Sequence, residues 1–110
     1  MPARPASASP AAERLPLTPI AFSILITLIE GDLHGYGIAR RIADREAGGV
    51  TLAPGNLYAA LDRLIEAGLV EAAEPRRRDT RRREYRITAF GREVAAAEAA
   101  RLQDLVRTAK

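Results

Sequence analysis

The stretch PGNLYAALDRLIEAG, residues 54–68, decides the fold because it predicts one well-defined amphipathic helix. Pro54 suits the first position of a helix, where its missing N–H leaves no hydrogen bond unmade. Leu57, Leu61 and Leu64 then recur at i, i+4 and i+7, so they share one face. The glycine that closes the stretch ends the pattern. The sequence therefore predicts a helix whose leucine face packs on a core and whose polar face is free.

Two more helices are predicted before this one. Thr18 and Pro19 supply a cap and a first residue for an apolar helix that runs through Glu30. Because that helix is apolar nearly all round, other elements must cover it. Residues 36–47 then place alanines and isoleucines on one side and charged residues on the other, which predicts a short amphipathic helix.

Two strands and a long helix are predicted after it. Residues 69–74 and 84–88 have short extended patterns and flank a charged segment, which indicates a hairpin. The alanine-rich stretch from Ala89 to about Ala109 has strong helix propensity. The predicted fold is therefore mainly α with a small β-hairpin (α+β), a winged helix-turn-helix with a C-terminal dimerisation helix. In such a fold the third helix enters the major groove of DNA.

The hairpin loop is rich in arginine. The stretch RRRDTRRREY covers residues 76–85, and within it residues 76–83 hold six arginines against Asp79, a local charge of +5, whereas the whole chain carries +3. Guanidinium groups pair with phosphates in bidentate fashion and enter narrow minor grooves. A solvated loop, or a compositional bias toward arginine, is the alternative. We expect DNA contacts from Arg76, Arg77, Arg78, Arg81, Arg82 and Arg83.

The polar face of helix 54–68 is the expected reading edge. Gly55 and Ala59 are small enough to let the backbone approach DNA, and Asn56 can contact a phosphate or read adenine. Asp62 and Glu66 repel phosphates, so the N-terminal half should enter the groove. Tyr58 lies at the border of the core face, where packing and DNA contact are equally supported. Further candidates for DNA contact are Arg63 in this helix, and Tyr36 with Arg40 or Arg41 in the helix before it.

The last helix carries an apolar stripe that the small core does not need. A second copy of the chain is the expected partner, which predicts a homodimer. Glu98 falls inside the stripe, where a carboxylate needs a partner: Arg101, an arginine across the dimer, or solvent at the edge of the stripe. The expected dimer contacts are Phe90, Val94, Leu102, Leu105 and Val106.

The totals exclude several function classes. A chain of 110 residues, 47% hydrophobic, supports one domain. With no cysteine and a single histidine, His34, we expect no metal site, no cofactor and no enzyme activity. The longest apolar run, residues 20–29, is about half of the roughly 20 needed to cross a bilayer, so we expect no membrane contact and a cytoplasmic protein.

The motifs resemble those of a known family. The pieces HGYGI (34–38), PGNLY (54–58), RLIEAGLV (63–70) and YRIT (85–88) closely resemble the PadR family of bacterial transcriptional regulators. The resemblance covers about residues 15–105 and fits the short class with one C-terminal helix. It implies a homodimeric repressor that binds an inverted-repeat operator, with a small-molecule effector in some members. Its domains would be a disordered tail (1–14), a DNA-binding domain (15–88) and a dimerisation helix (89–110).

Some residues depart from the family pattern. The chain has no tryptophan, which some short members use to bind flat aromatic compounds between subunits. Asn56 stands where members often carry Ser or Thr, so the preferred base can differ. Ala53 caps a helix weakly. A different function remains open at this point: a winged-helix module whose arginines dock an acidic protein partner.

Overall fold

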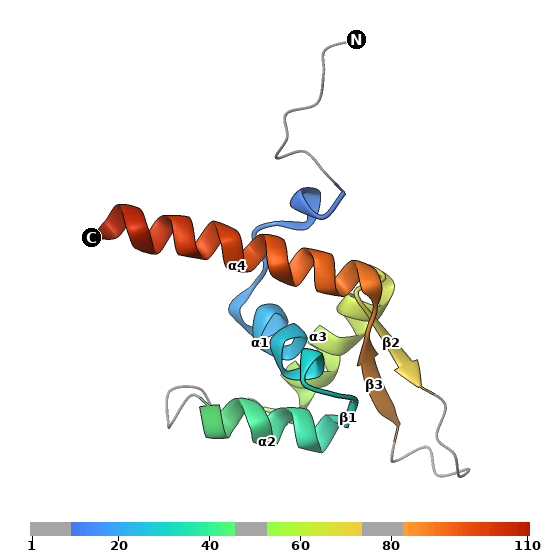
Figure 1. Cartoon of the computed structure of the whole chain (residues 1–110). Helices are drawn as coiled ribbons and strands as arrows, with labels where there is room; N and C mark the ends of the chain where they lie inside the picture. The colour runs from blue at the N-terminus through green and yellow to red at the C-terminus, as the bar shows by residue number, and fades with distance from the viewer. Residues whose placement is uncertain (1–9, 46–52, 74–82) are drawn as a thin grey trace.

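The computed structural model describes residues 10–45, 53–73 and 83–110, and within these ranges four α-helices and a small sheet form one body (Figure 1). The first predicted helix lies at its centre, between the last helix and the second. The fold class predicted from the sequence is confirmed. In chain order the elements are η2 (Ala12–Arg14), α1 (Pro19–Ile29), β1 (Leu33–His34), α2 (Gly35–Arg45), α3 (Pro54–Glu66), β2 (Val70–Ala73), β3 (Glu84–Ile87) and α4 (Ala89–Ala109).

The helix ends follow local signals. At the start of α1, Thr18 Oγ1 accepts a hydrogen bond from the amide of Ala21 at 3.1 Å, and Pro19 is the first helical residue. The residue two positions beyond the end of α3, Gly68, has φ +80°, a left-handed conformation that glycine adopts without strain. The predicted start of α1 and the predicted end of α3 are therefore confirmed within a residue or two.

The core forms around α1. Ile24, Leu25 and Leu28 are almost completely buried, as the all-round apolar character of this helix requires. The predicted leucine face of α3 is buried as well. The other elements contribute the remaining core residues, among them Ile38, Ile42, Leu69, Val70, Tyr85, Ile87, Val94 and Ala95.

The sheet has three strands rather than the predicted two. Its order is β1-β3-β2 and both pairings are antiparallel, with Val70 opposite Ile87 and Leu33 opposite Tyr85. The segment GDLHG, interpreted from sequence as a loop, therefore supplies an edge strand. Two residues are too few to show an alternating pattern, and only the pairing with β3 identifies them as a strand.

The N-terminal segment is ordered further toward the N-terminus than predicted. Residues 12–14, which fall within the predicted tail, form the short helix η2, and Ala11 before them packs against the core. Residues 1–9 lie outside the described residues. The backbone N–H of Leu17 donates a 2.7 Å hydrogen bond to Oε2 of Glu98, and Nε of Arg101 donates to the other carboxylate oxygen, Oε1. Of the three sequence alternatives for Glu98, the partner within its own helix is the one found.

Candidate nucleic-acid interface

The N-terminal half of α2 presents an exposed tyrosine and an arginine together. Tyr36 is 74% exposed. One turn later, Nη1 of Arg40 donates to the hydroxyl of Tyr36 at 3.4 Å, and this contact raises the pKa of Arg40. The pair therefore forms a cationic point at the N-terminal end of α2.

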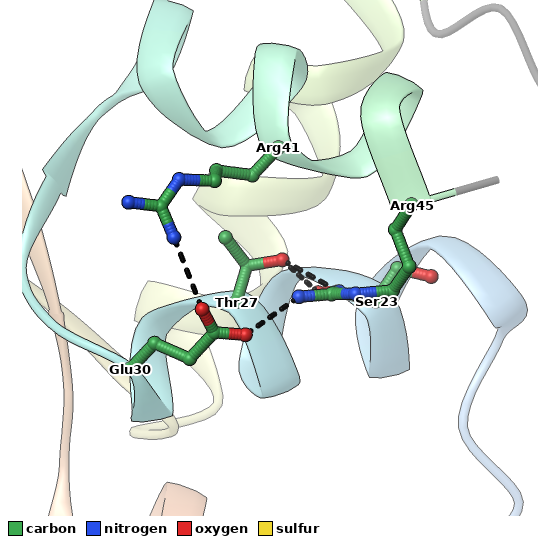
Figure 2. Close-up of polar contacts among 5 residues, drawn as sticks. All are labelled: Ser23, Thr27, Glu30, Arg41 and Arg45. Atoms are coloured by element: carbon green, nitrogen blue, oxygen red, sulfur yellow. Dashed lines mark hydrogen bonds and ion pairs between the residues drawn. The ribbon is translucent and has the colours of Figure 1, made fainter. Parts of the chain in front are cut away.

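The next arginines of α2 are turned the other way. Nη1 of Arg41 lies 3.0 Å from one carboxylate oxygen of Glu30, and Nη2 of Arg45 lies 2.8 Å from the other (Figure 2). Arg45 also donates to the hydroxyl of Thr27 at 3.1 Å, which in turn donates to the carbonyl of Ser23. These contacts fix α2 on α1. The sequence left open whether Arg40 or Arg41 contacts DNA. Arg41 is paired with Glu30 between α1 and α2, whereas Arg40 points to another face of α2.

The exposed face of α3 is the predicted one. Leu57 and Leu61 are buried, while Gly55, Asn56 and Ala59 are exposed on the other side. A Cβ added at Gly55 would meet nothing within 4 Å, so the space beside the first turn is open to a ligand. Arg63 and Asp62 are also exposed, but they lie nearly two turns further along the helix.

Tyr58 joins α3 to the start of α2. It is 47% exposed, and its ring lies over Gly35 so closely that a Cβ there would be 2.7 Å from the tyrosine hydroxyl. Only glycine at position 35 leaves room for this contact. This role of Gly35 was not predicted from the sequence, although a glycine in the first turn of a helix was a visible signal. The contact places the Tyr36 and Arg40 pair and the N-terminal half of α3 on adjoining surfaces.

The hairpin of β2 and β3, which forms the base of the wing, lies beside α3. Tyr85 of β3 is nearly buried, and burial is the main cause that raises its pKa. Tyr58 and Asp62 raise this pKa further, whereas Arg83 lowers it. Arg83 is exposed at the start of β3. The other five predicted wing residues lie outside the described residues: Arg76, Arg77, Arg78, Arg81 and Arg82.

The predicted dimer residues fall into two groups. The C-terminal half of α4 extends past the rest of the body (Figure 1), and Leu105 and Val106 on it are 54% and 56% exposed. Leu102 is half-buried. Val94, however, is fully buried among the chain's own core residues, so its prediction as a dimer contact is wrong. Phe90 is partly buried and packs against the same core.

The single histidine has a local partner. Nε2 of His34 lies 4.0 Å from a carboxylate oxygen of Glu84, its neighbour across β1 and β3, and both side chains are about half exposed. Within the described ranges, no three His, Cys, Asp or Glu side chains are grouped so that they could hold a metal ion. In the same ranges, no helix has the length and apolar character needed to cross a membrane.

Comparison with protein families gives a match over most of the described core. The model of the transcriptional regulator PadR-like family matches residues 24–97. An uncharacterized 37.1 kDa protein in transposon TN4556 of Streptomyces fradiae is 40% identical over 76 residues, which cover 69% of this chain and 21% of that protein. The chain thus spans about a fifth of the length of this relative.

Solved structures share the fold. A transcriptional regulator from Clostridium thermocellum superposes with a TM-score of 0.73 at 28% identity, over 81% of this chain and 84% of the other. Bacillus subtilis PadR, solved in complex with operator DNA, gives a TM-score of 0.64 at 20% identity, over 74% of this chain and 45% of the other. At that identity the second similarity shows the fold alone.

Proposed function

Since the chain belongs to the transcriptional regulator PadR-like family, we propose that it binds an inverted-repeat operator as a homodimer and represses transcription by occupying promoter DNA. One observation carries the proposal. The open edge of α3 at Gly55 and Asn56 adjoins the exposed pair Tyr36 and Arg40 through the contact of Tyr58 with Gly35. Bacillus subtilis PadR, which has the same fold, was solved in complex with operator DNA, and this agrees with a DNA-binding role.

In this arrangement α3 contacts the bases, and the start of α2 contacts the phosphates. Asn56 on the first turn of α3 can donate to and accept from a base edge, and the empty space at Gly55 lets the helix backbone come close. Arg40 and the hydroxyl of Tyr36 reach the phosphates at the edge of the groove, which positions the protein without reading sequence. The arginines of residues 76–83 add phosphate or minor-groove contacts.

The exposed half of α4 supplies the dimer contact. Leu102 and Val106 line a shallow depression together with Gln103, and Leu105 lies next to them in the helix. Pairing these surfaces about a two-fold axis buries apolar area that the single chain exposes. Two α3 helices then address half-sites about 34 Å apart, one turn of DNA. An effector, whose identity the residues do not specify, would act by binding one dimer geometry better than another.

Selection of bound duplexes from a fully randomised pool tests the proposal. The expected result is one motif repeated with two-fold symmetry, whose preference over random DNA persists as salt rises. Asn56→Ala should change the preferred base at one position in each half, with a loss of about 1–3 kcal/mol. A chain that binds all duplexes weakly and releases them together as salt rises would instead be an acidic-partner module.

The two arginines of α2 provide a matched pair of variants. Arg40→Ala should weaken binding to every duplex and reduce the slope of log K against log salt by about one, the value for one lost phosphate contact. Arg41→Ala removes the same charge from the next residue, but that charge is held by Glu30. Its salt slope should match the wild type. Equal slopes for the two variants would contradict the assignment of Arg40.

A further inference from the structure

The end of α3 and the start of α4 are tied together by the main chain and one hydroxyl. Oγ1 of Thr88 donates to the carbonyl of Gly68 at 2.7 Å and accepts from the amide of Gly91 at 2.9 Å. The backbone N–H of Thr88 donates to the carbonyl of Leu69 at 3.0 Å. One residue therefore caps α4 and also holds the turn between α3 and β2 at two successive carbonyls.

Gly91 brings the two segments into direct contact. A Cβ at this position would overlap the carbonyl oxygen of Leu69 and lie 2.7 Å from Cγ1 of Ile87. Gly91 is itself buried in the first turn of α4. The backbone of α4 at Gly91 therefore packs directly on the backbone of the turn at Leu69, with no side chain between them that could adjust to a shift.

The same turn is bonded to α3. The N–H of Leu69 donates to the carbonyl of Leu64 at 2.9 Å, and the N–H of Gly68 donates to the carbonyl of Ile65 at 3.0 Å. Leu69 therefore accepts from Thr88 on one side and donates to α3 on the other. Two consecutive backbone hydrogen bonds connect α3 to the first residue before α4.

We propose that this junction sets the angle between the recognition helix α3 and the dimer helix α4, and hence the separation of half-sites that the dimer accepts. Thr88 is a positioning residue in this scheme: it touches no DNA and acts through the turn at Gly68 and Leu69. The inference rests on the proposed function, because only a dimer that reads two half-sites has a separation to fix. A looser junction lets the two α3 helices sample several separations with the same reading edge.

Three variants separate the hydrogen bond that Thr88 donates to Gly68 from the cap bond that it accepts from Gly91. Thr88→Asp keeps an acceptor for the amide of Gly91, and a carboxylate suits a helix N-terminus, but it cannot donate to the carbonyl of Gly68. Thr88→Ser keeps both bonds. Thr108→Val is the matched control, because it removes a hydroxyl-to-carbonyl hydrogen bond of 2.9 Å from Thr108 to Asp104 at the far end of the same helix.

The measurement is the number of base pairs between the two halves in duplexes that each full-length variant selects from a randomised pool. Wild type, Thr88→Ser and Thr108→Val should each favour one separation. Thr88→Asp should select the same half-site motif, with the preference for that separation over its neighbours reduced about fivefold, the ratio for one net hydrogen bond.

Two outcomes overturn the inference. One is a Thr88→Asp separation profile identical to that of the wild type, and the other is a changed half-site motif, which would make Thr88 part of the reading surface. Should Thr88→Asp fail to fold, Thr88→Val removes the bond to Gly68 together with the cap bond from Gly91, and it should likewise reduce the preference for one separation without changing the half-site motif. If the wild-type chain itself selects no paired half-sites, the proposed function fails first, and that result is distinct from either outcome.

Discussion

The two halves of α4 differ in what they contact, although one apolar stripe runs along both. In the N-terminal half, Gly91, Val94 and Glu98 are buried by elements of the same chain. In the C-terminal half, Leu105 and Val106 are more than half exposed, and the helix extends away from the body (Figure 1). The same helical periodicity therefore belongs to a core in one half and to a free surface in the other.

The difference shows what a helical stripe can and cannot tell. Apolar spacing indicates that a face will be covered, but the identity of the cover depends on segments distant in sequence. The covering contact at Glu98 comes from Leu17, 81 residues away. A substitution in the first half should therefore act on folding, and one in the second half on association.

Gly91→Ala should have the largest effect. The new Cβ would overlap the carbonyl oxygen of Leu69, so the free energy of unfolding should fall by about 3 kcal/mol, the upper range for overpacking. Denaturant unfolding of the two proteins gives the difference. Gly55→Ala is the control, because a Cβ there meets nothing and a helical alanine is favoured by up to about 1 kcal/mol. Equal stability of the two variants would show that α4 does not pack on the turn as described.

Glu98→Ala should destabilise by about 2 kcal/mol. It leaves the N–H of Leu17 without its acceptor and deprives Arg101 of its partner, and an unsatisfied buried donor costs about 1–3 kcal/mol. Amide hydrogen exchange at Leu17 should accelerate as well. The control is Glu93→Ala, which removes an exposed carboxylate from the same half of α4. If the two alanine variants were equally stable, the N-terminal segment would not depend on Glu98.

Leu105→Ala should leave the folding of the single chain unchanged and weaken the dimer. Burial of a leucine contributes about 1.5–3 kcal/mol, so the dissociation constant should rise at least about tenfold. Sedimentation equilibrium measures it. Val94→Ala should behave in the opposite way, with lower stability and little direct effect on association, because Val94 is fully buried in the core of its own chain. A dissociation constant insensitive to Leu105 would refute the dimer surface.

The sequence predicted the elements that carry local signals. The cap and proline at Thr18 and Pro19, and the leucine spacing in residues 54–68, depend on neighbours within one or two turns and were confirmed. The strand at residues 33–34 has no such signal, because its pairing with β3 is its only definition. The order of residues 12–14 and the buried state of Val94 were missed for the same reason, since both depend on how α4 lies on the body.

For the candidate interface, the sequence predicted the outward face of α3 but not how it is joined to α2. The ring of Tyr58 packs on Gly35 and joins α3 to α2, and the helical periodicity of the sequence does not predict such a contact between elements. The pairing of Arg41 with Glu30 at the end of α1 (Figure 2) could not be predicted from the helical pattern of residues 36–47 alone. Residue type and spacing therefore identify the face of α3 that could read DNA, but the packing of α2 on α1 determines which arginines of α2 are held by Glu30.

The smallest expected effect is that of pH on the free energy of unfolding. Its measurement separates the stabilisation due to the charge of Glu98 from that due to its hydrogen bonds. The hydrogen bond from Arg101 is the main cause that lowers the pKa of Glu98, the N–H of Leu17 lowers it further, and burial opposes both. Because the pKa is lower in the folded than in the unfolded chain, the charged form stabilises the fold above the unfolded value of about 4.3 and that part is lost as pH falls through the folded value.

Glu98→Gln keeps an oxygen for the N–H of Leu17 but has no charge to titrate. The difference in unfolding free energy between wild type and Glu98→Gln should be constant from about pH 8 to about pH 5 and should narrow below that. Denaturant titrations at a series of pH values measure it. A difference that stayed constant into acid would mean that the carboxylate acts on the N-terminal segment through its hydrogen bonds alone. The contrast between the halves of α4 would then rest on burial and not on charge.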